Sequence, residues 1–383
     1  MIPTENMEHP EAPKRTRLEE LWLLFKENRL AILGLVIFAL FFTTAVVGLI
    51  LTSGQDPILD PAIIRLQEKL LPPLAKPSLE TMSQNEAPKL GIYLFGTDDL
   101  GRDVFARMLQ GAWVSLTVGF VAVGISVLVG IFMGGIAGFF GQRHITYDQV
   151  LITAIMFAGV VLLGLGKDMA GIAALFVGHA SIAFLFISKR TFWKKNSIPK
   201  WLKTLHRNAI ALDTIIMRLV DIMLCFPSFF LILTVVALLP ASMYNIMIVI
   251  GLTSWMGTTR FVRAEFLSLR EQDFVAAAKA LGVGNFRIIF RHMMPNAIAP
   301  VLVSATIGIA TAILTEAGLS FLGFGVPPPH ATWGNILSDG KRFIFDAPWL
   351  TFIPGISILI VVLCFNLFGE GLKDAMNPKL REK

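Results

Sequence analysis

Long stretches without a charged side chain constrain this chain more than any other feature of its sequence. Residues 30–51, 112–140, 222–259 and 348–369 contain no Asp, Glu, Lys or Arg. A helix needs roughly 20 apolar residues to cross about 30 Å of hydrocarbon, and each of these stretches is long enough. Because lipid offers no partner to an unpaired backbone group, such stretches must be helical. The sequence therefore predicts an all-α, polytopic integral membrane protein.

The composition excludes an ordinary soluble globular protein, since 55% of the residues are hydrophobic, 16% are charged and the mean hydropathy is +0.68. The net charge of +6 does not indicate nucleic-acid binding, because Lys and Arg cluster beside the apolar stretches, where they fix orientation. Cys225 and Cys364 lie inside apolar stretches, so we expect small hydrophobic side chains rather than a disulfide. A cleavable signal peptide is not expected, because the first 29 residues are polar.

Eight spans are predicted, arranged as a helical bundle. They cover residues 30–51, 112–140, 149–166, 169–188, two helices within 222–259 divided at Pro240, 296–325 and 348–369. With eight spans, the basic stretches at residues 1–29, 189–207, 260–291 and 372–383 fall on one side. That side should be cytoplasmic, which places both termini in the cytoplasm.

A polar island, DFVAAAKALGVGNFRIIFRHMMP at residues 273–295, separates two apolar stretches. Phe274, Ala277, Ala278 and Leu281 recur at helical spacing and predict one apolar face. Gly282 stands where a helix end favours positive φ, and we expect Asn285 to cap a second short helix that carries Ile288, Ile289 and His292. Pro295 suits the first turn of the next span. A helix-turn-helix of this kind is suited to lie in the groove of another protein.

The island resembles the EAA loop of ABC-importer membrane subunits, the segment that docks onto a separate ATPase. Ala277, Ala278, Gly282, Ile288, His292 and Pro295 match the pattern of that loop, and Ala276 stands in the position of its Glu. The resemblance implies that these seven residues form the ATPase-docking loop.

Six further blocks resemble the C-type permeases of dipeptide, oligopeptide and nickel importers, in the same order along the chain. They are GTDDLGRDVFARMLQGA from Gly96, IMRLVDIMLCFPS from Ile216, LTEAGLSFLGFGVPPP from Leu314, TWGNIL from Thr332, APWLTFIPG from Ala347 and FNLFGEGLKDAMNPKL from Phe365. The resemblance implies a six-span ABC type I importer permease core. It also implies a translocation path for di- or oligopeptides or a related small solute in a bacterial inner membrane.

Residues 142–211 interrupt this resemblance, because related permeases join the flanking segments by a short turn. The insertion contains two apolar stretches and the basic stretch 189–207, so it is predicted to be a membrane hairpin. Either it is peripheral to transport, or its basic stretch docks a partner or anionic lipid. The predicted organisation is a cytoplasmic tail (1–29), a first span (30–51), an extracytoplasmic segment (52–111), the permease core (112–141 and 212–371), the inserted hairpin (142–211) and a cytoplasmic tail (372–383).

Single polar residues and a proline in or beside the predicted spans have more than one possible role. Glu316, inside a predicted span, either lines the translocation path or packs and hydrogen-bonds. Pro227 is expected to kink its span, with a gating hinge as the alternative. His179 is expected to be a satisfied core histidine, and Asp221 a structural residue near the membrane interface. The six histidines lack metal-ligand spacing.

A charged cluster before the second predicted span and a row of glycines inside that span are both expected to be structural. Asp98, Asp99, Arg102 and Asp103 are expected to cap and pair locally at the outer face, with a binding-protein contact as the alternative. The spacing of Gly130, Gly134 and Gly138 is typical of close helix packing.

The predicted function is a permease subunit without enzymatic activity or cofactor of its own. No phosphate-binding loop of the GxxxxGK[ST] type is present, so ATP must bind to partner subunits. The resemblance implies a second homologous permease, two ABC ATPases and an extracytoplasmic solute-binding protein as partners, with membrane lipid around the chain. The alternative is a self-contained secondary transporter, for which paired broken helices and inverted repeats would be expected. A membrane-embedded enzyme has no nucleophile, base or metal constellation to support it.

Overall fold

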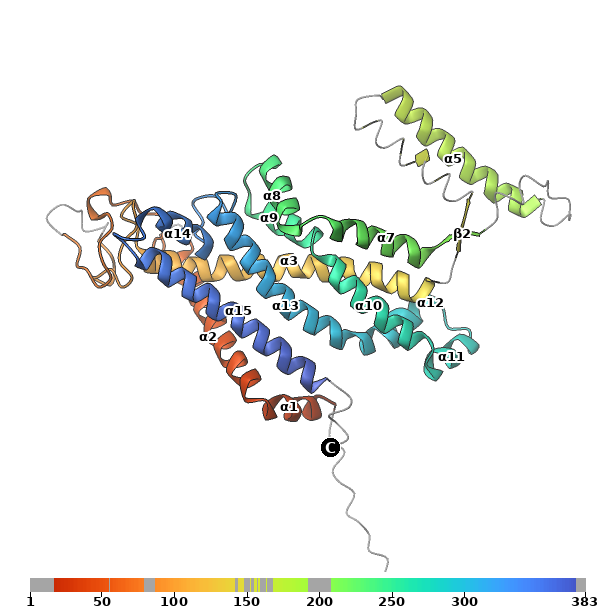
Figure 1. Cartoon of the computed structure of the whole chain (residues 1–383), viewed down its shortest axis with the longest axis horizontal. Helices are drawn as coiled ribbons and strands as arrows, with labels where there is room; N and C mark the ends of the chain where they lie inside the picture. The colour runs from red at the N-terminus through yellow and green to blue at the C-terminus, as the bar shows by residue number, and fades with distance from the viewer. Residues whose placement is uncertain are drawn as a thin grey trace, which may run out of the picture. The chain divides into compact units, whose positions relative to one another are not determined.

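The computed structural model describes residues 17–54, 56–78, 87–141, 144–147, 168–191 and 208–376, with the single positions 152, 155, 156, 158 and 163. The described chain is mostly helical (Figure 1), as its charge-free stretches predict. It divides into two compact units. The first comprises Met1–Gly130, Phe226–Phe261 and Asn296–Lys383, and the second comprises Ile131–Cys225 and Val262–Pro295.

The first unit is built from apolar helices and one long loop segment. It contains α1 (Arg17–Glu27), α2 (Arg29–Thr52), η1 (Leu66–Glu68), α8 (Ser228–Leu238), α9 (Met243–Leu252), α14 (Trp333–Gly340), η4 (Lys341–Phe343) and α15 (Trp349–Ala375), with most of α3 (Val104–Phe140) and α13 (Met294–Phe321) and the start of α10 (Trp255–Arg270). Asn28 caps α2 by accepting hydrogen bonds from the backbone N–H groups of Leu30 and Ala31.

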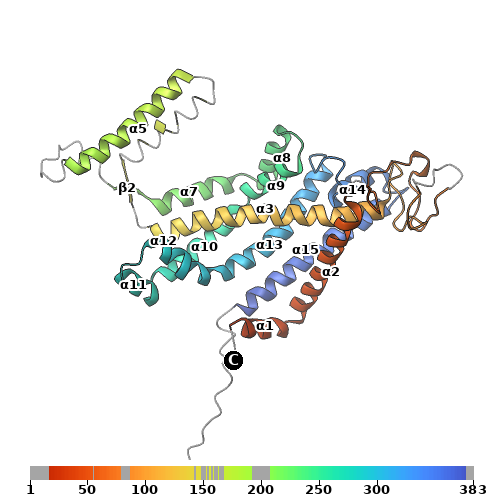
Figure 2. The same cartoon turned by 180° about the vertical axis from the view of Figure 1, so that it is seen from behind.

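The core of the first unit forms where α3, α9, α13 and α15 bring their aliphatic side chains together, for example Val118, Ile250, Ile313 and Leu350. The helices α2 and α15 pack along each other, as Figures 1 and 2 show from opposite sides. Aromatic rings add to this contact, with the Phe38 and Phe365 centroids 5.4 Å apart.

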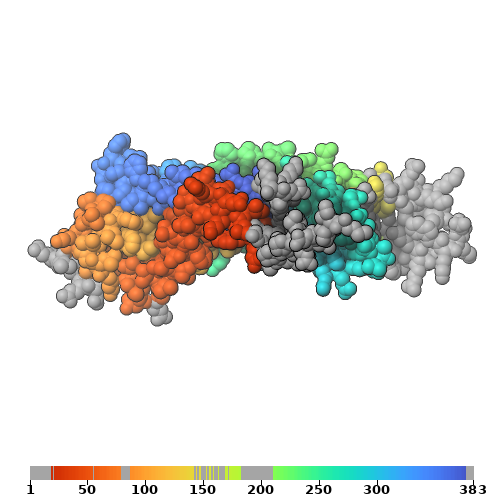
Figure 3. Space-filling model, turned by 90° about the horizontal axis from the view of Figure 1, so that it is seen from below, coloured from red at the N-terminus to blue at the C-terminus, as the bar shows by residue number. Residues whose placement is uncertain are grey.

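The loop segment before α3 is ordered by its contacts with the rest of the first unit. The Trp349 indole Nε1 donates to the Thr97 carbonyl at 3.3 Å, and Phe95 and Leu70 pack on the core. Figure 3 shows this segment, in orange, meeting the blue surface of the C-terminal part of the chain. The segment is thus packed against one end of the helices of the first unit.

The second unit is smaller. It contains the end of α3, β1 (His144–Thr146), α5 (Asp168–Thr191), β2 (Asn208–Ala211), α7 (Leu212–Cys225), the end of α10, α11 (Asp273–Ala280), α12 (Asn285–Arg287) and the π-helical turn η3 (Ile288–Met293). The strands β1 and β2 pair antiparallel, with Ile145 opposite Ile210. Gly138 of α3 lies so close to Phe266 of α10 that a Cβ there would stand 2.5 Å from the Phe266 Cβ. The expected close packing is confirmed at this glycine and at Gly130, where a Cβ would stand 2.6 Å from Thr258.

Within the described residues, four helices are long and apolar enough to span a membrane: Arg29–Thr52, Val104–Phe140, Asn285–Phe321 and Trp349–Ala375. A fifth span is possible if α7 and α8, which are interrupted at Phe226 and Pro227, are counted together. The polytopic all-α fold is therefore confirmed, whereas the count of eight stays a prediction. Residues 149–166 and 189–207 lie largely outside the described residues, and α5 contributes a shorter apolar helix, Ile172–Ile182.

Candidate functional site

The polar island, residues 273–295, forms a helix-turn-helix that we call the Gly282 loop. Its first helix, α11, ends in a turn centred on Gly282, which has φ of +74°. The Val283 N–H bonds to the Ala278 carbonyl and the Gly282 N–H to the Lys279 carbonyl, both at 3.0 Å. This pair of bonds is the Schellman motif, which needs a left-handed residue at the Gly282 position. The prediction of positive φ at Gly282 is confirmed.

The second half of the Gly282 loop continues into α13 without a break. Asn285 is its first helical residue, whereas Gly284 is the N-cap and no side chain caps the helix, so the expected Asn285 cap is wrong. The wide π turn ends at Met293, two residues before Pro295, with the Met294 N–H bonded to the Ile289 carbonyl. Proline has no N–H and its ring crowds the preceding turn, so a widened turn accommodates Pro295 inside a continuous helix.

The Gly282 loop is fixed to the rest of the second unit by buried apolar residues and by a contact of Lys279, and the end of α10 before it is held by two arginine contacts. Val275, Ala278, Ile288 and Met293 are buried. The Lys279 ammonium lies 5.6 Å from the centroid of the Phe139 ring, and an Arg270 Nη1 donates to the Gly138 carbonyl at 3.5 Å. Arg263, further back on α10, forms a two-bond ion pair with Asp213 of α7.

The opposite side of the Gly282 loop presents apolar side chains to the outside. Phe274, Leu281, Phe286 and Phe290 are 40%, 83%, 75% and 50% exposed, and we call these four residues the exposed apolar face. The Phe286 and Phe290 rings lie 4.5 Å apart. Exposed Arg287 and Arg291 flank them. Contiguous apolar surface bordered by charged side chains is typical of a protein-binding site.

The residues predicted from the sequence divide between these two sides. Ala276, Ala277, Gly282 and Pro295 are exposed, His292 is half-buried, and Ala278 and Ile288 belong to the buried side. The sequence patterns did not predict Phe286 and Phe290 as part of this site. Their spacing of four residues, directly after the Gly282 turn, is the signal that could have found them.

Two candidates for a pore or packing role lie in the first unit. Glu316 of α13 is 1% exposed, and its Oε1 accepts a hydrogen bond from the Ser320 hydroxyl at 2.7 Å. This position fits the packing alternative better than a residue lining a path. Pro227 directly precedes α8 at the interruption after α7, where a proline ends one helix and starts the next. The gating alternative for Pro227 stays a prediction.

Other singled-out residues have structural partners. Asp98 is fully buried and pairs with Arg102 at 2.7 Å and with Arg107 at 2.5 Å, and both arginines reach Asp339 of α14. Burial raises the pKa of the Asp103 carboxyl, and burial together with the charge of Asp98 raises that of Asp99.

The remaining singled-out residues lie on surfaces or in the core. His179 is exposed on α5, with its Nδ1 2.8 Å from the Leu175 carbonyl, so a core position is wrong. Asp221 is partly exposed and lies beside Arg218. Cys225 is exposed and Cys364 is buried, and both are free thiols.

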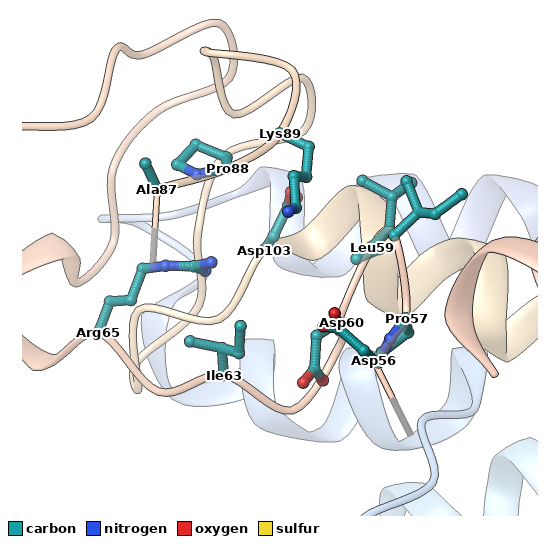
Figure 4. Close-up of a pocket in the computed structure, with 12 residues that line it drawn as sticks. Asp56, Pro57, Leu59, Asp60, Ile63, Arg65, Ala87, Pro88, Lys89 and Asp103 are labelled. Carbon is teal, nitrogen blue, oxygen red and sulfur yellow. The ribbon is translucent and has the colours of Figure 1, made fainter. Parts of the chain in front are cut away.

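A small cavity of about 70 Å³ lies in the loop segment before α3 (Figure 4). Arg65 and Lys89 reach into it from two separate loops, and Asp60 and Asp103 also line it. Since a water molecule occupies about 30 Å³ in the liquid, this volume suits about two waters and is too small for a peptide. Among the described residues no cluster of His, Cys, Asp and Glu has the geometry of a metal site.

The fold defines a polytopic helical membrane protein, and its Gly282 loop holds an apolar face exposed. Comparison with known families agrees. The family described as "Binding-protein-dependent transport system inner membrane component" matches residues 206–382, and "N-terminal TM domain of oligopeptide transport permease C" matches residues 16–73.

Curated relatives resemble the chain over nearly its whole length. The dipeptide transport system permease protein DppC of Alkalihalophilus pseudofirmus is 35% identical, covering 100% of this chain and 97% of the relative. The DppC protein of Haemophilus influenzae is 33% identical, covering 97% of each chain. The oligopeptide transport system permease protein OppC of Bacillus subtilis is 30% identical, covering 94% of this chain and 89% of the relative. The chain belongs to the family of C-type permease subunits of dipeptide and oligopeptide ABC importers. The members of this family are transport subunits and not enzymes.

Proposed function

We propose that this chain forms part of the translocation path for di- or oligopeptides and is driven by separate ATPase subunits that dock on its Gly282 loop. The observation that carries the proposal is the exposed apolar face, which the loop holds outward while its other side is buried. An amphipathic helix pair fixed in this way fits a groove in a partner protein. The relatives named above are permeases of dipeptide and oligopeptide transport systems, which supports peptides as the cargo.

The proposed assembly contains a second homologous permease, two ABC ATPases and an extracytoplasmic solute-binding protein. ATP binds to the ATPases, and the chain carries no cofactor. Closure of the ATPases pushes on the Gly282 loop, and the helices alternate between inward and outward openings. The chain lies in a bacterial inner membrane with both termini and the Gly282 loop in the cytoplasm, an orientation supported by its basic stretches.

The insertion at residues 142–211 is proposed to be a membrane hairpin of two spans. Its described helix α5 exposes apolar side chains around its circumference, including Met169, Ile172, Phe176 and Ile182. A helix that is apolar all round suits a lipid environment. The basic stretch 189–207 then returns to the cytoplasmic side, where anionic lipid is a suitable partner.

Replacing Phe286 by Asp tests the docking role. Phe286 is 75% exposed, so F286D leaves the buried side of the loop intact. Burying a carboxylate in an apolar groove is unfavourable, so co-purification of the ATPase subunits and ATP-driven peptide uptake should both fall by at least about tenfold. Phe345, which is 96% exposed and lies outside the Gly282 loop, provides the matched control, because F345D should retain the ATPases. Undiminished ATPase binding by F286D would rule out this docking surface.

A further inference from the structure

A cavity of about 270 Å³ opens within the first unit among α3, α9, α10 and α13. Five of its lining residues carry hydroxyl groups, and we call the cavity the hydroxyl hollow: Ser126, Ser254, Thr258, Ser304 and Thr311. The other lining residues are Gly, Ala or larger apolar residues, and none of the lining residues is charged. The surface of the hollow is therefore mostly apolar, and its only polar side chains are these uncharged hydroxyl groups.

The hydroxyl groups retain hydrogen-bonding capacity toward the hollow. The Ser254 and Thr311 hydroxyls donate to the carbonyls of Ile250 and Ile307 at 2.7 and 3.0 Å. Each donates its only hydrogen in this way, and its oxygen can still accept. The Thr258 and Ser304 hydroxyl oxygens lie 3.2 Å apart and share one hydrogen bond, which leaves one of their two hydrogens for another acceptor. The hollow therefore offers both donors and acceptors.

We infer that the hydroxyl hollow is this subunit's contact with the main chain of the transported peptide. The inference rests on the proposed function and adds a site to it. An extended peptide carries N–H and C=O groups that are unpaired once it leaves water, and it needs acceptors and donors in alternation. Hydroxyl groups supply both, and uncharged walls neither attract nor repel a particular peptide side chain. A path lined in this way passes peptides of different side-chain charge by binding the part that all of them share.

A helix of another membrane subunit is the competing occupant, because small and hydroxyl residues also allow helices to approach closely. The chemistry favours the peptide. A helix uses its backbone N–H groups within itself, so it offers no backbone donor to the Ser254 and Thr311 oxygens, which can still accept. An extended peptide brings both N–H groups for these oxygens and carbonyl groups for the available hydrogen of the Thr258 and Ser304 pair.

The test measures the import rates of two peptides, tri-alanine and tri-alanine that is N-methylated at both peptide bonds. The complete importer is placed in proteoliposomes, and the binding protein is supplied at saturating concentration, already loaded with the peptide that is measured. Wild type should import the unmethylated peptide about three- to tenfold faster, as expected for the loss of about one hydrogen bond. The double variant T258V/S304A removes two hydroxyl oxygens that can accept peptide N–H groups, together with the hydrogen that they donate, and should move this ratio toward one. It should also slow tri-alanine, tri-lysine and tri-glutamate by the same factor.

The variant T234V is the control, since the Thr234 hydroxyl bonds to its own helix at Phe230 and does not line the hollow. An unchanged ratio in T258V/S304A, with full uptake, overturns the inference while leaving the proposed function intact. Loss of the second permease from the purified T258V/S304A complex also overturns it, because the hollow would then be a subunit interface. Wild-type protein that imports no tri-alanine contradicts the proposed function as well.

Discussion

Tyr93 shows how strongly a single residue's surroundings act in the loop segment before α3. Its side chain is fully buried beneath the Arg65 guanidinium, which lies 5.9 Å from the ring centroid. Burial raises the pKa of the Tyr93 phenol to about 12, although the Arg65 charge acts in the opposite direction. The unfolded chain ionises this phenol near pH 10, whereas the folded chain keeps it neutral. Stability from the neutral phenol is therefore complete below pH 10 and is lost as the pH rises through about 12.

This pH dependence can be measured by tyrosinate absorbance at 295 nm on purified protein in detergent. The chain has three tyrosines, and the other two, Tyr147 and Tyr244, are exposed. We expect a late-titrating component that corresponds to one tyrosine and that is absent from Y93F. If the titration of Y93F kept that component, Tyr93 would not be the buried phenol that causes it.

The sequence predicted the roles of single residues well where the backbone sets the role. It predicted them less well where the role depends on neighbours that are distant in the chain. Gly282 was predictable, because only a residue tolerant of positive φ suits the end of α11. Asn285 was mispredicted, because the backbone continues as a helix past it and requires no side-chain cap. The exposure of Phe286 depends on which side of the Gly282 loop packs toward Phe139, which lies far away in the sequence.

Among the elements, α7 and α10 are joined by the ion pair of Asp213 and Arg263, which holds the base of the Gly282 loop in the second unit. An Arg263 Nη2 donates to Asp213 Oδ2 at 2.6 Å, and the Nε donates to Oδ1. The bond to Asp213 raises the pKa of the Arg263 guanidinium. Both side chains are partly exposed, at 30% and 22%. The pair thus acts as a clamp between two helices and is not a buried charge cluster.

Reversing the two charges tests this clamp. D213R and R263D each place like charges together, so each should lower the melting temperature and reduce peptide uptake per ATP hydrolysed by at least about threefold. A hydrogen-bonded ion pair contributes about 1.5–3 kcal/mol, which sets this scale. The double variant D213R/R263D restores the attraction and should recover most of both quantities. Additive losses in the double variant would show that the two side chains do not act through each other.

The start of α3 shows why some element boundaries could not be predicted. The predicted span begins at Ala112, yet α3 begins at Val104 and includes Arg107. The Arg107 side chain is 4% exposed and is neutralised by Asp98 from the preceding loop and by Asp339 of α14. Since Asp339 lies far along the chain, no local pattern indicates that this charge is compensated. The predicted spans 30–51 and 348–369 carry no charge and need no such partner, and the observed α2 and α15 each begin within one residue of them.

At the scale of the whole molecule, the question is which ends of the helices share a side of the membrane. The helix α13 has 28 residues, which at about 1.5 Å each exceeds the roughly 30 Å of hydrocarbon. Leu281 precedes this helix and Phe345 follows it, and they are 83% and 96% exposed. If α13 crosses once, these two positions must face opposite compartments. From the basic residues of the Gly282 loop we expect Leu281 to face the cytoplasm.

Cysteine labelling tests this orientation in cells that make the chain without its ATPase partners. C225S/C364S removes both native thiols, and the serine at position 364 can keep the bond that the Cys364 thiol makes to the Gly34 carbonyl at 3.0 Å. On this background a membrane-impermeant maleimide should label F345C in intact cells but L281C only in inverted vesicles. Labelling of both positions from the same side would mean that α13 does not cross the membrane. Labelling of L281C in intact cells would contradict both the predicted orientation and the ATPase-docking proposal, because a loop facing outward cannot meet a nucleotide-binding partner.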